Sequence, residues 1–187
     1  PSWQPPISDL TGIEDFTALT NLSLLAQPLT NLDLSNNINL THLQLENGLL
    51  TSLDVSGCTA LKHFSMDYCW GITGTIDFSN NIALETLNIF EHNLTSLDLT
   101  NNTSLSFLNI CGDFQSSSPN FTYLDVRNGN NSNISHFSVW PFHGCYILVD
   151  DPVWSTANWN PNTQYNSFHP FYPPSSNSTV IVCDSYT

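Results

Sequence analysis

Two versions of one short pattern alternate along most of the chain. Each reads leucine–x–x–leucine–x–leucine, with other apolar residues in place of some leucines. The first version starts at Leu29, Leu50, Thr73 and Leu94, and the second at Leu40, Leu61, Leu84 and Leu105. One period takes 21 residues, as from Leu32 to Leu53, and an insertion at Trp70-Gly71-Ile72 stretches the third period to 23. Self-similarity at such a period indicates a solenoid in which each repeat forms one coil.

The alternation inside each pattern predicts two β-strands per coil, because successive side chains of a strand point to opposite faces. Stacked coils then form two parallel sheets, which we call face A (first version) and face B (second version). Face A is expected to bury two columns, Leu32, Leu53, Ile76, Leu97, Leu124 and Leu34, Val55, Phe78, Leu99, Val126. Face B is expected to bury Leu22, Leu43, Phe64, Leu87, Leu108, Phe137 and Leu24, Leu45, Met66, Ile89, Ile110, Val139. No coil can bury its apolar side alone, so stability comes from the stacking of neighbours.

A polar or cysteine position follows each face A strand. It is occupied by Asn37, Cys58, Asn81 and Asn102. In leucine-rich repeats, which this pattern resembles, the Asn/Cys side chain satisfies backbone groups at the corner of the coil. We therefore predict a β-rich solenoid: a right-handed leucine-rich-repeat array with coils of about 21 residues, two parallel sheets and an irregular C-terminal cap.

Two segments resemble a narrower family. Residues 7–24, ISDLTGIEDFTALTNLSL, together with the repeated LTSLDLSNN-like units, look like the surface leucine-rich-repeat proteins of Bacteroidota, which are often exported by the type IX secretion system. Residues 145–159, CYILVDDPVWSTANW, resemble the segment that closes such arrays, and Cys183 fits the later cysteine of that segment. The resemblance implies a secreted, cell-surface protein. It says little about the ligand, because these repeats are generic scaffolds.

The composition changes at Trp140. Ten of the 22 aromatic residues and six of the 11 prolines fall in the last 48 positions. We therefore divide the chain into a solenoid at 1–139 and an aromatic, proline-rich cap at 140–187. A loop-rich cap with little core gains from a covalent clamp, and together with the resemblance this predicts a disulfide between Cys145 and Cys183. The remaining cysteines are expected to be buried and free.

The charge balance excludes several partners. The chain has 16 acidic residues against two basic ones, a formal net charge of −14. Nucleic acids and anionic membrane surfaces require Lys and Arg, so neither is expected as a partner. No apolar run approaches the ~20 residues of a membrane span, which argues against membrane insertion. Cationic ligands, metal ions, proteins and neutral polysaccharides stay open.

One outward column of face A consists of aspartates, namely Asp33, Asp54, Asp77, Asp98 and Asp125. Carboxylates about 5 Å apart repel one another, which should raise their pKa values or recruit cations. A low-affinity Ca²⁺ ladder is one interpretation, since hard cations take oxygen ligands. The other, which we prefer, is a solvated repeat residue that hydrogen-bonds neighbouring Ser or Thr side chains and needs no metal or other cofactor.

The outward residues of face B are less regular, and irregular exposed residues on a regular scaffold are typical of binding sites. The candidate ligand-binding residues are Tyr68, Trp70, Phe90, Phe107 and Trp140. The alternative for Trp70 is that its loop simply folds over the ridge. His42 and His63, with Glu46 and Asp67 nearby, lack the third fixed ligand that a transition-metal site needs, so we expect them to be solvated.

The cap aromatics Trp140, Trp154, Trp159, Tyr165, Phe168 and Tyr172 could stack on sugars, but we expect them to form the cap's own core. The sequence contains no nucleophile elbow, phosphate loop, zinc-protease or dinucleotide motif, so no enzyme is expected. We expect a non-enzymatic extracellular binding or adhesion module that recognises a glycan or a protein. The alternative is a structural subunit that self-associates end to end through the solenoid edges.

Overall fold

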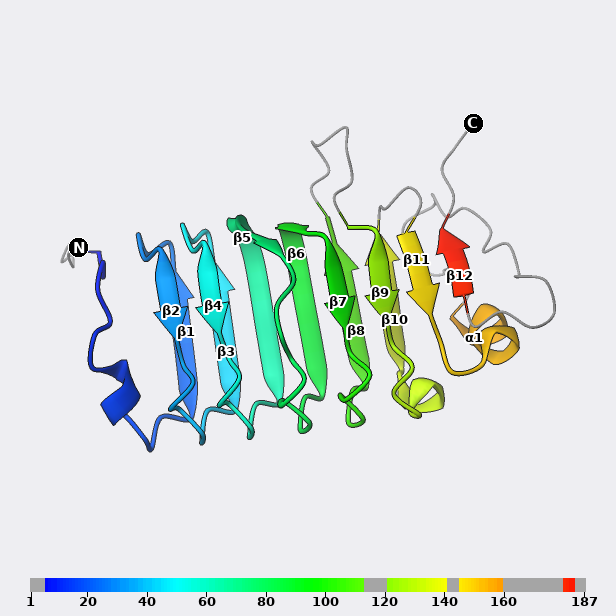
Figure 1. Ribbon diagram of the computed structural model, residues 1–187, viewed down its shortest axis with the longest axis horizontal. Helices are drawn as coiled ribbons and strands as arrows, with labels where there is room; N and C mark the ends of the chain where they lie inside the picture. Colours follow the sequence, from blue (N-terminus) through cyan, green and yellow to red (C-terminus); the bar gives the residue numbers. More distant parts are fainter. Residues whose placement is uncertain (1–5, 113–120, 141–144, 160–179, 184–187) are drawn as a thin grey trace.

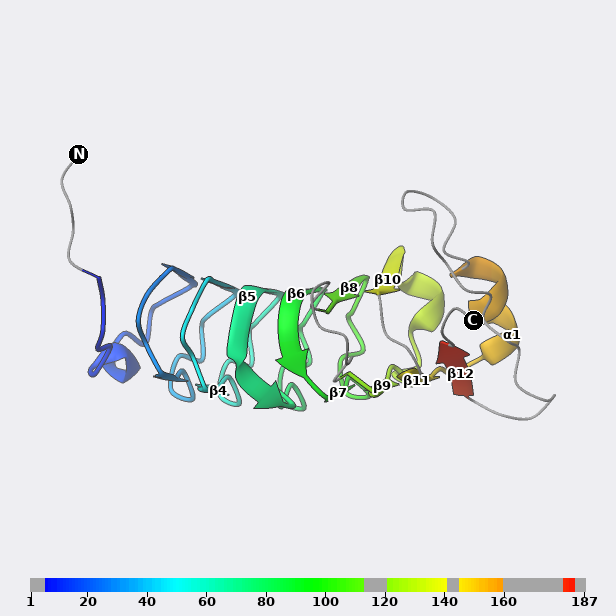
Figure 2. The same cartoon turned by 90° about the horizontal axis from the view of Figure 1, so that it is seen from above.

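The computed structural model describes residues 6–112, 121–140, 145–159 and 180–183 and shows a β-solenoid with two layers of strands (Figures 1 and 2). Face B is one six-stranded parallel sheet. Its strands, in order, are β1 (Asn21–Leu25), β3 (His42–Glu46), β5 (His63–Gly74), β6 (Thr86–Leu94), β8 (Phe107–Cys111) and β10 (His136–Trp140). Leu22 pairs with Leu43 and Leu43 with Phe64, so these neighbouring strands are one 21-residue repeat apart. The predicted leucine-rich-repeat solenoid is confirmed.

Face A is interrupted, where the sequence predicted a continuous parallel sheet. It consists of the pair β2 (Asn31–Asp33) and β4 (Ser52–Asp54), and of a separate four-stranded sheet. The strands of the latter are β7 (Ser96–Asp98), β9 (Tyr123–Asp125), β11 (Cys145–Leu148) and β12 (Val180–Cys183), and β12 runs antiparallel to β11. Residues 75–78 form no strand, although Ile76 and Phe78 are buried.

The interruption lies beside the insertion in the third coil. β5 continues through Trp70 and Ile72 to Gly74 and stays paired with β6, while the register shifts between Cys69 and Thr73. This long pair carries the chain over the corner between the two faces. The extra residues therefore lengthen face B at the position where face A loses its strand.

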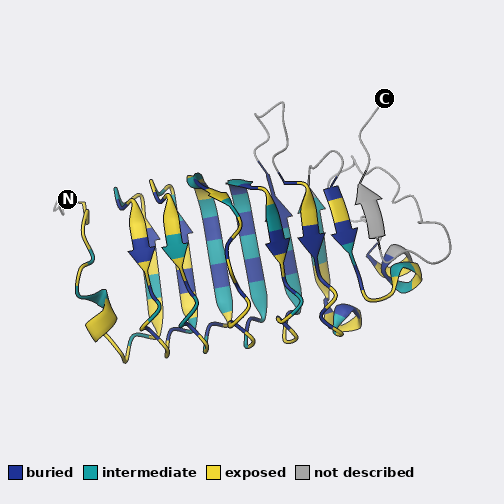
Figure 3. Cartoon of the chain, viewed as in Figure 1, coloured by how far each residue is buried: buried dark blue, intermediate teal, exposed yellow. Residues whose placement is uncertain are grey.

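The predicted core columns lie between the two sheets, where Figure 3 shows the alternation of buried and exposed residues along the strands. Nearly all of these side chains are fully buried. The partly buried ones include Leu22 in β1 and Phe137 and Val139 in β10. These belong to the first and last strands of face B, which have a neighbour on one side only, and the partly buried Leu53 lies in β4, which likewise pairs with one strand. Each fully buried side chain contributes about 1.5–3 kcal/mol, and a coil with two neighbours gains the most.

Side-chain amides join successive coils at the corner after face A. Asn81 Nδ2 donates to the carbonyl oxygens of Val55 (3.0 Å) and Cys58 (2.8 Å) in the coil before it. Asn102 repeats this contact with Phe78 (3.0 Å) and with Asn81 (2.9 Å). The same type of bond is made by Asn37 to Ile13 and Phe16, by Cys58 to Leu34 and by Asn128 to Asn102. The predicted structural role of these residues is confirmed, and Asn128 makes a further contact of this kind that was not predicted from the sequence.

The two ends of the solenoid differ. Near the N-terminus a short 3₁₀-helix, η1 (Ile13–Asp15), precedes β1. At the C-terminal end lie a second 3₁₀-helix, η2 (Asn131–Asn133), and the helix α1 (Pro152–Asn158). Asp151 caps α1 by accepting hydrogen bonds from the amides of the second and third residues that follow it, at 2.9 and 3.0 Å. This helix was not predicted within the cap.

Trp159 follows α1 and is buried, stacked on Phe137 of β10 at a ring-centroid distance of 4.0 Å. Trp154 contacts Trp159 edge to face at 5.9 Å. These two rings therefore belong to the packing of the C-terminal end, as expected. Tyr165, Phe168 and Tyr172 lie outside the described residues, and association through the solenoid ends stays a prediction.

We predict that Asn81→Ala lowers the free energy of unfolding by about 2 kcal/mol, because two buried hydrogen bonds between coils are lost. Asn80→Ala is the matched control, since Asn80 is exposed on the same turn and should change stability by about 0.5 kcal/mol or less. Urea unfolding followed by circular dichroism measures both variants. Equal midpoints for the two would contradict the role given to the asparagine contacts.

Candidate ligand-binding surface

Three of the five candidate residues, Tyr68, Trp70 and Phe90, form one group on strands β5 and β6 of face B. Tyr68 lies between the other two, with ring-centroid distances of 5.8 Å to Trp70 and 5.6 Å to Phe90. Both contacts are edge to face, at interplanar angles of 78° and 75°. Tyr68 is 37% exposed and Trp70 46% exposed, while Phe90 is half-buried. We call Tyr68, Trp70 and Phe90 the aromatic cluster.

The other two candidates do not join the aromatic cluster. Phe107 lies in another outward column and stacks on His136 at 4.3 Å. The Trp140 backbone pairs with Cys111 in the column of Phe90, but the Trp140 side chain lies outside the described residues. Of the five expected ligand-binding residues, the structure therefore brings three together.

The backbone at Tyr68 has an unusual conformation. Its φ of 55° lies in the left-handed region, which costs a residue with a side chain roughly 1–2 kcal/mol. Ala26, Asn47 and Glu91 occupy the same corner in other coils and have φ values of 50–52°. The recurrence shows that the turn at this position of β1, β3, β5 and β6 adopts this conformation. The residue at the corner varies, and in the third coil it presents a tyrosine ring.

Two carboxylates adjoin the aromatic cluster. The register of face B places Glu46, Asp67 and Phe90 side by side on β3, β5 and β6. Burial raises the pKa of Asp67, and the neighbouring charge of Glu46 raises this pKa further. Asp67 Oδ1 accepts a hydrogen bond from Asn88 Nδ2 at 3.3 Å, and Glu46 Oε1 accepts one from Asn47 Nδ2 at 3.1 Å. The surface thus combines aromatic rings with two acidic groups.

A column of amides and hydroxyls runs along the middle of face B. Asn109 Nδ2 donates to Asn88 Oδ1 at 2.7 Å, and Asn88 Nδ2 also donates to Ser65 Oγ at 3.1 Å. In the adjacent column, the rings of His42 and His63 are 4.4 Å apart. Within the described residues there is no group of three or more His, Cys, Asp or Glu side chains arranged to hold a metal ion.

The aspartates of face A are engaged in local turns. The carboxylates of Asp33, Asp54, Asp77 and Asp98 each accept a hydrogen bond from the backbone amide two residues later, at 2.8–3.0 Å. Hydrogen bonds from the side chain and the backbone of Ser35 lower the pKa of Asp33. Ser79 lowers the pKa of Asp77 in the same way.

Asp125 differs because it is 3% exposed and bonded to Arg127. Burial alone would raise its pKa, but the hydrogen bonds and charge of Arg127 outweigh burial, and the pKa is lowered. The expectation that mutual repulsion raises the pKa values of this column is therefore wrong for Asp33, Asp77 and Asp125. Local donors stabilise the charged form more than the neighbouring carboxylates destabilise it. The Ca²⁺ ladder stays the less favoured interpretation of this column.

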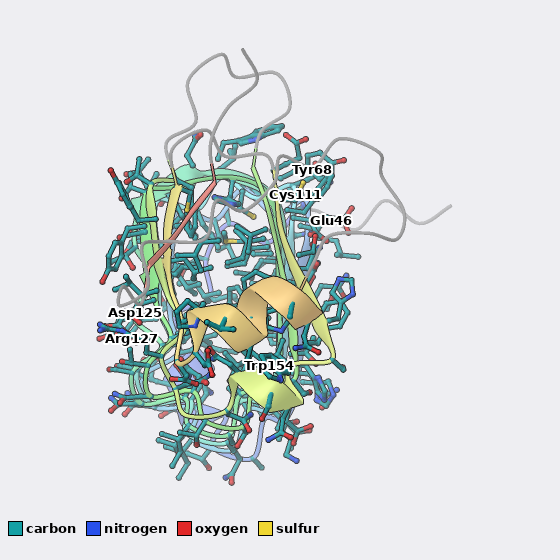
Figure 4. The ribbon with its side chains drawn as sticks, turned by 90° about the vertical axis from the view of Figure 1, so that its right-hand side faces the viewer. Glu46, Tyr68, Cys111, Asp125, Arg127 and Trp154 are labelled. Carbon is teal, nitrogen blue, oxygen red and sulfur yellow. The ribbon has the colours of Figure 1, made fainter. Side chains whose placement is uncertain are left out.

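Figure 4 shows that the acidic residues of face A and those beside the aromatic cluster lie far apart. Glu46 and Tyr68 lie on one side of the molecule and Asp125 and Arg127 on the opposite side, across the core, with Trp154 at the end nearest the viewer. Chemistry at the aromatic cluster is thus independent of the aspartates of face A.

Three cysteines, Cys58, Cys69 and Cys111, are buried and free, as expected. Burial raises the pKa of Cys58 to about 11 and that of Cys111 to about 12, so both stay protonated and unreactive at neutral pH. The charges of nearby acidic residues contribute a smaller part of each increase.

Cys145 of β11 and Cys183 of β12 are directly opposite in the antiparallel register. Opposed residues of such a pair have Cα atoms roughly 4.5–5.5 Å apart, a spacing compatible with a disulfide. We predict that mass spectrometry of the unreduced, oxidised protein finds one peptide pair cross-linked between these residues. Cys58→Ser should leave the cross-link unchanged, whereas Cys145→Ser should abolish it. Free thiols at both positions after expression in an oxidising compartment would contradict the prediction.

The coils and their asparagine contacts define the class of the protein as a leucine-rich-repeat solenoid. No family model and no curated protein matches the chain. Among solved structures, the chain is similar to the functional domain of InlJ from Listeria monocytogenes, which includes a cysteine ladder. The two share 26% identity over 65% of this chain and 42% of that chain, with a TM-score of 0.31. At that score no functional argument rests on the likeness. Among the described residues, no helix has the length and apolar character to cross a membrane.

Several features of this surface could not be recognised from the sequence. The left-handed corner is one, because glycine, the usual signal, does not occupy it at Ala26, Tyr68 or Glu91. The contact of Tyr68 with both Trp70 and Phe90 depends on the path of the insertion. The 23-residue spacing of the third coil was the available signal that the scaffold changes there.

Proposed function

We propose that the protein is a non-enzymatic extracellular adhesion or binding module, and that face B around the aromatic cluster binds a protein or a glycan. The observation that carries this proposal is the exposure of Tyr68 and Trp70 on a scaffold whose other apolar positions are mostly turned inward. Exposed, clustered aromatic side chains are enriched in binding sites because they offer a large contact area with little loss of conformational freedom.

The surroundings of the aromatic cluster support the proposal. The amide column at Asn88 and Asn109 supplies donors and acceptors beside the rings, which is the mixture that glycan and protein interfaces use. The strands that carry these groups are held on both sides by other strands. A ligand would therefore meet a preorganised surface and lose little affinity to ordering.

The location outside the cell is supported by the chain's composition and by its resemblance to surface repeat proteins. With only two basic residues, the protein is unsuited to nucleic acid. The predicted cap disulfide would require an oxidising compartment.

We predict that Trp70→Ala and Phe90→Ala each weaken binding to a ligand found on polysaccharide or protein arrays by at least about tenfold, since an aromatic anchor contributes roughly 2 kcal/mol. Tyr146→Ala is the matched control, because Tyr146 is an aromatic residue of face A with 53% exposure. Surface plasmon resonance measures affinity, and circular dichroism confirms that the variants fold. Unchanged affinity in both face B variants would count against the proposal.

A further inference from the structure

The acidic groups beside the aromatic cluster narrow the ligand class. We propose that the partner at this surface is a polypeptide segment that inserts a lysine or arginine side chain between the aromatic cluster and the carboxylates of Glu46 and Asp67. The inference rests on the proposed function, because it specifies what face B binds.

The rings are arranged to accept a cation. The electron-rich face of Trp or Tyr attracts an ammonium or guanidinium group within about 6 Å of the ring centroid. Tyr68 meets both of its aromatic neighbours edge to face, an arrangement in which each contact occupies only one face of one ring of the pair. Trp70 carries the ring type that binds cations best, and it is more exposed than Tyr68.

The carboxylates supply the complementary charge. Glu46 and Asp67 lie on neighbouring strands about 4.8 Å apart across the sheet, and Asp67 lies next to Phe90 on the following strand. Asp67 accepts hydrogen bonds from the side chains of Asn88 and Ser65, and Glu46 accepts one from Asn47, all of which are neutral donors. The increase in the pKa of Asp67, caused by burial and by Glu46, indicates that this like-charged pair would be stabilised by an incoming cation.

Neither Lys62 nor Arg127, the chain's one lysine and one arginine, supplies that cation, because both form ion pairs elsewhere. Lys62 Nζ is 2.7 Å from Glu85 Oε1, and Arg127 Nη2 is 2.6 Å from Asp125 Oδ2 on face A. The net charge of −14 would also attract a basic partner over longer distances and accelerate its association. Charge complementarity therefore favours a basic polypeptide over a neutral glycan.

The test uses hexalysine as the probe and isothermal titration calorimetry of the full chain at physiological salt. Asp67→Asn and Trp70→Ala should each weaken hexalysine binding by about fivefold, the effect expected for one cation contact. Asp54→Asn is the matched control, because it removes the same charge from an exposed site of face A and should change the affinity by less than about twofold. Glu46→Gln provides a second face B variant if Asp67→Asn fails to fold.

Each outcome decides the inference. Equal weakening by Asp54→Asn and Asp67→Asn would show non-specific attraction by net charge and overturn it. Binding of a neutral polysaccharide that is lost in Trp70→Ala but kept in Asp67→Asn, without a hexalysine site, would also overturn it while leaving the proposed function intact. If Trp70→Ala changes the binding of neither probe, the inference and the proposed binding surface both fail.

Discussion

Contact between successive coils is the interaction on which the rest of the structure depends. A single coil has two short strands and a few apolar side chains, and it can remove them from water only where another coil covers it. The buried asparagines add directionality to this contact, because Asn81 and Asn102 each donate to two backbone carbonyls of the coil before. Apolar burial supplies most of the stabilisation, and the amide bonds fix the register at which it occurs.

Because stability comes from contacts between coils, the residues on the outside of the solenoid are free to vary. Outward positions of a strand do not enter the core, so the same scaffold carries aspartates on face A and rings, amides and carboxylates on face B. The aromatic cluster arises where the repeat is least regular. The insertion at Trp70 extends β5 and β6 around the corner, and the left-handed turn at Tyr68 places a ring between Trp70 and Phe90.

The buried columns could be predicted from the sequence, because the repeat period and the alternation of apolar residues determine which side chains share a column. Leu43, Phe64 and Leu87 are adjacent on β3, β5 and β6, as their spacing predicted. The break in face A at residues 75–78 did not follow, since Ile76 and Phe78 keep the alternation of a strand even though no strand forms there. The helix α1 was also missed, although Asp151 and Pro152 are typical of a helix start.

The candidate surface was predictable only in part. The irregular aromatic residues could be identified as a group, but their contacts depend on how the insertion turns the corner, and this separates Phe107 from the others. The pKa values of Asp33, Asp77 and Asp125 were predicted in the wrong direction, because the prediction counted repulsion between coils and left out the hydrogen bond that each carboxylate accepts from a backbone amide in its own coil. Local hydrogen bonds of this kind are short-range features that a column of identical residues conceals.

Amide hydrogen exchange across the face B strands is the most direct test of coil stacking as the source of stability. The account predicts the slowest exchange in β5 and β6, which have strands on both sides, and markedly faster exchange in β1 at the end of the sheet. Protection of β1 equal to that of β6, or rapid exchange throughout β5 and β6, would contradict it.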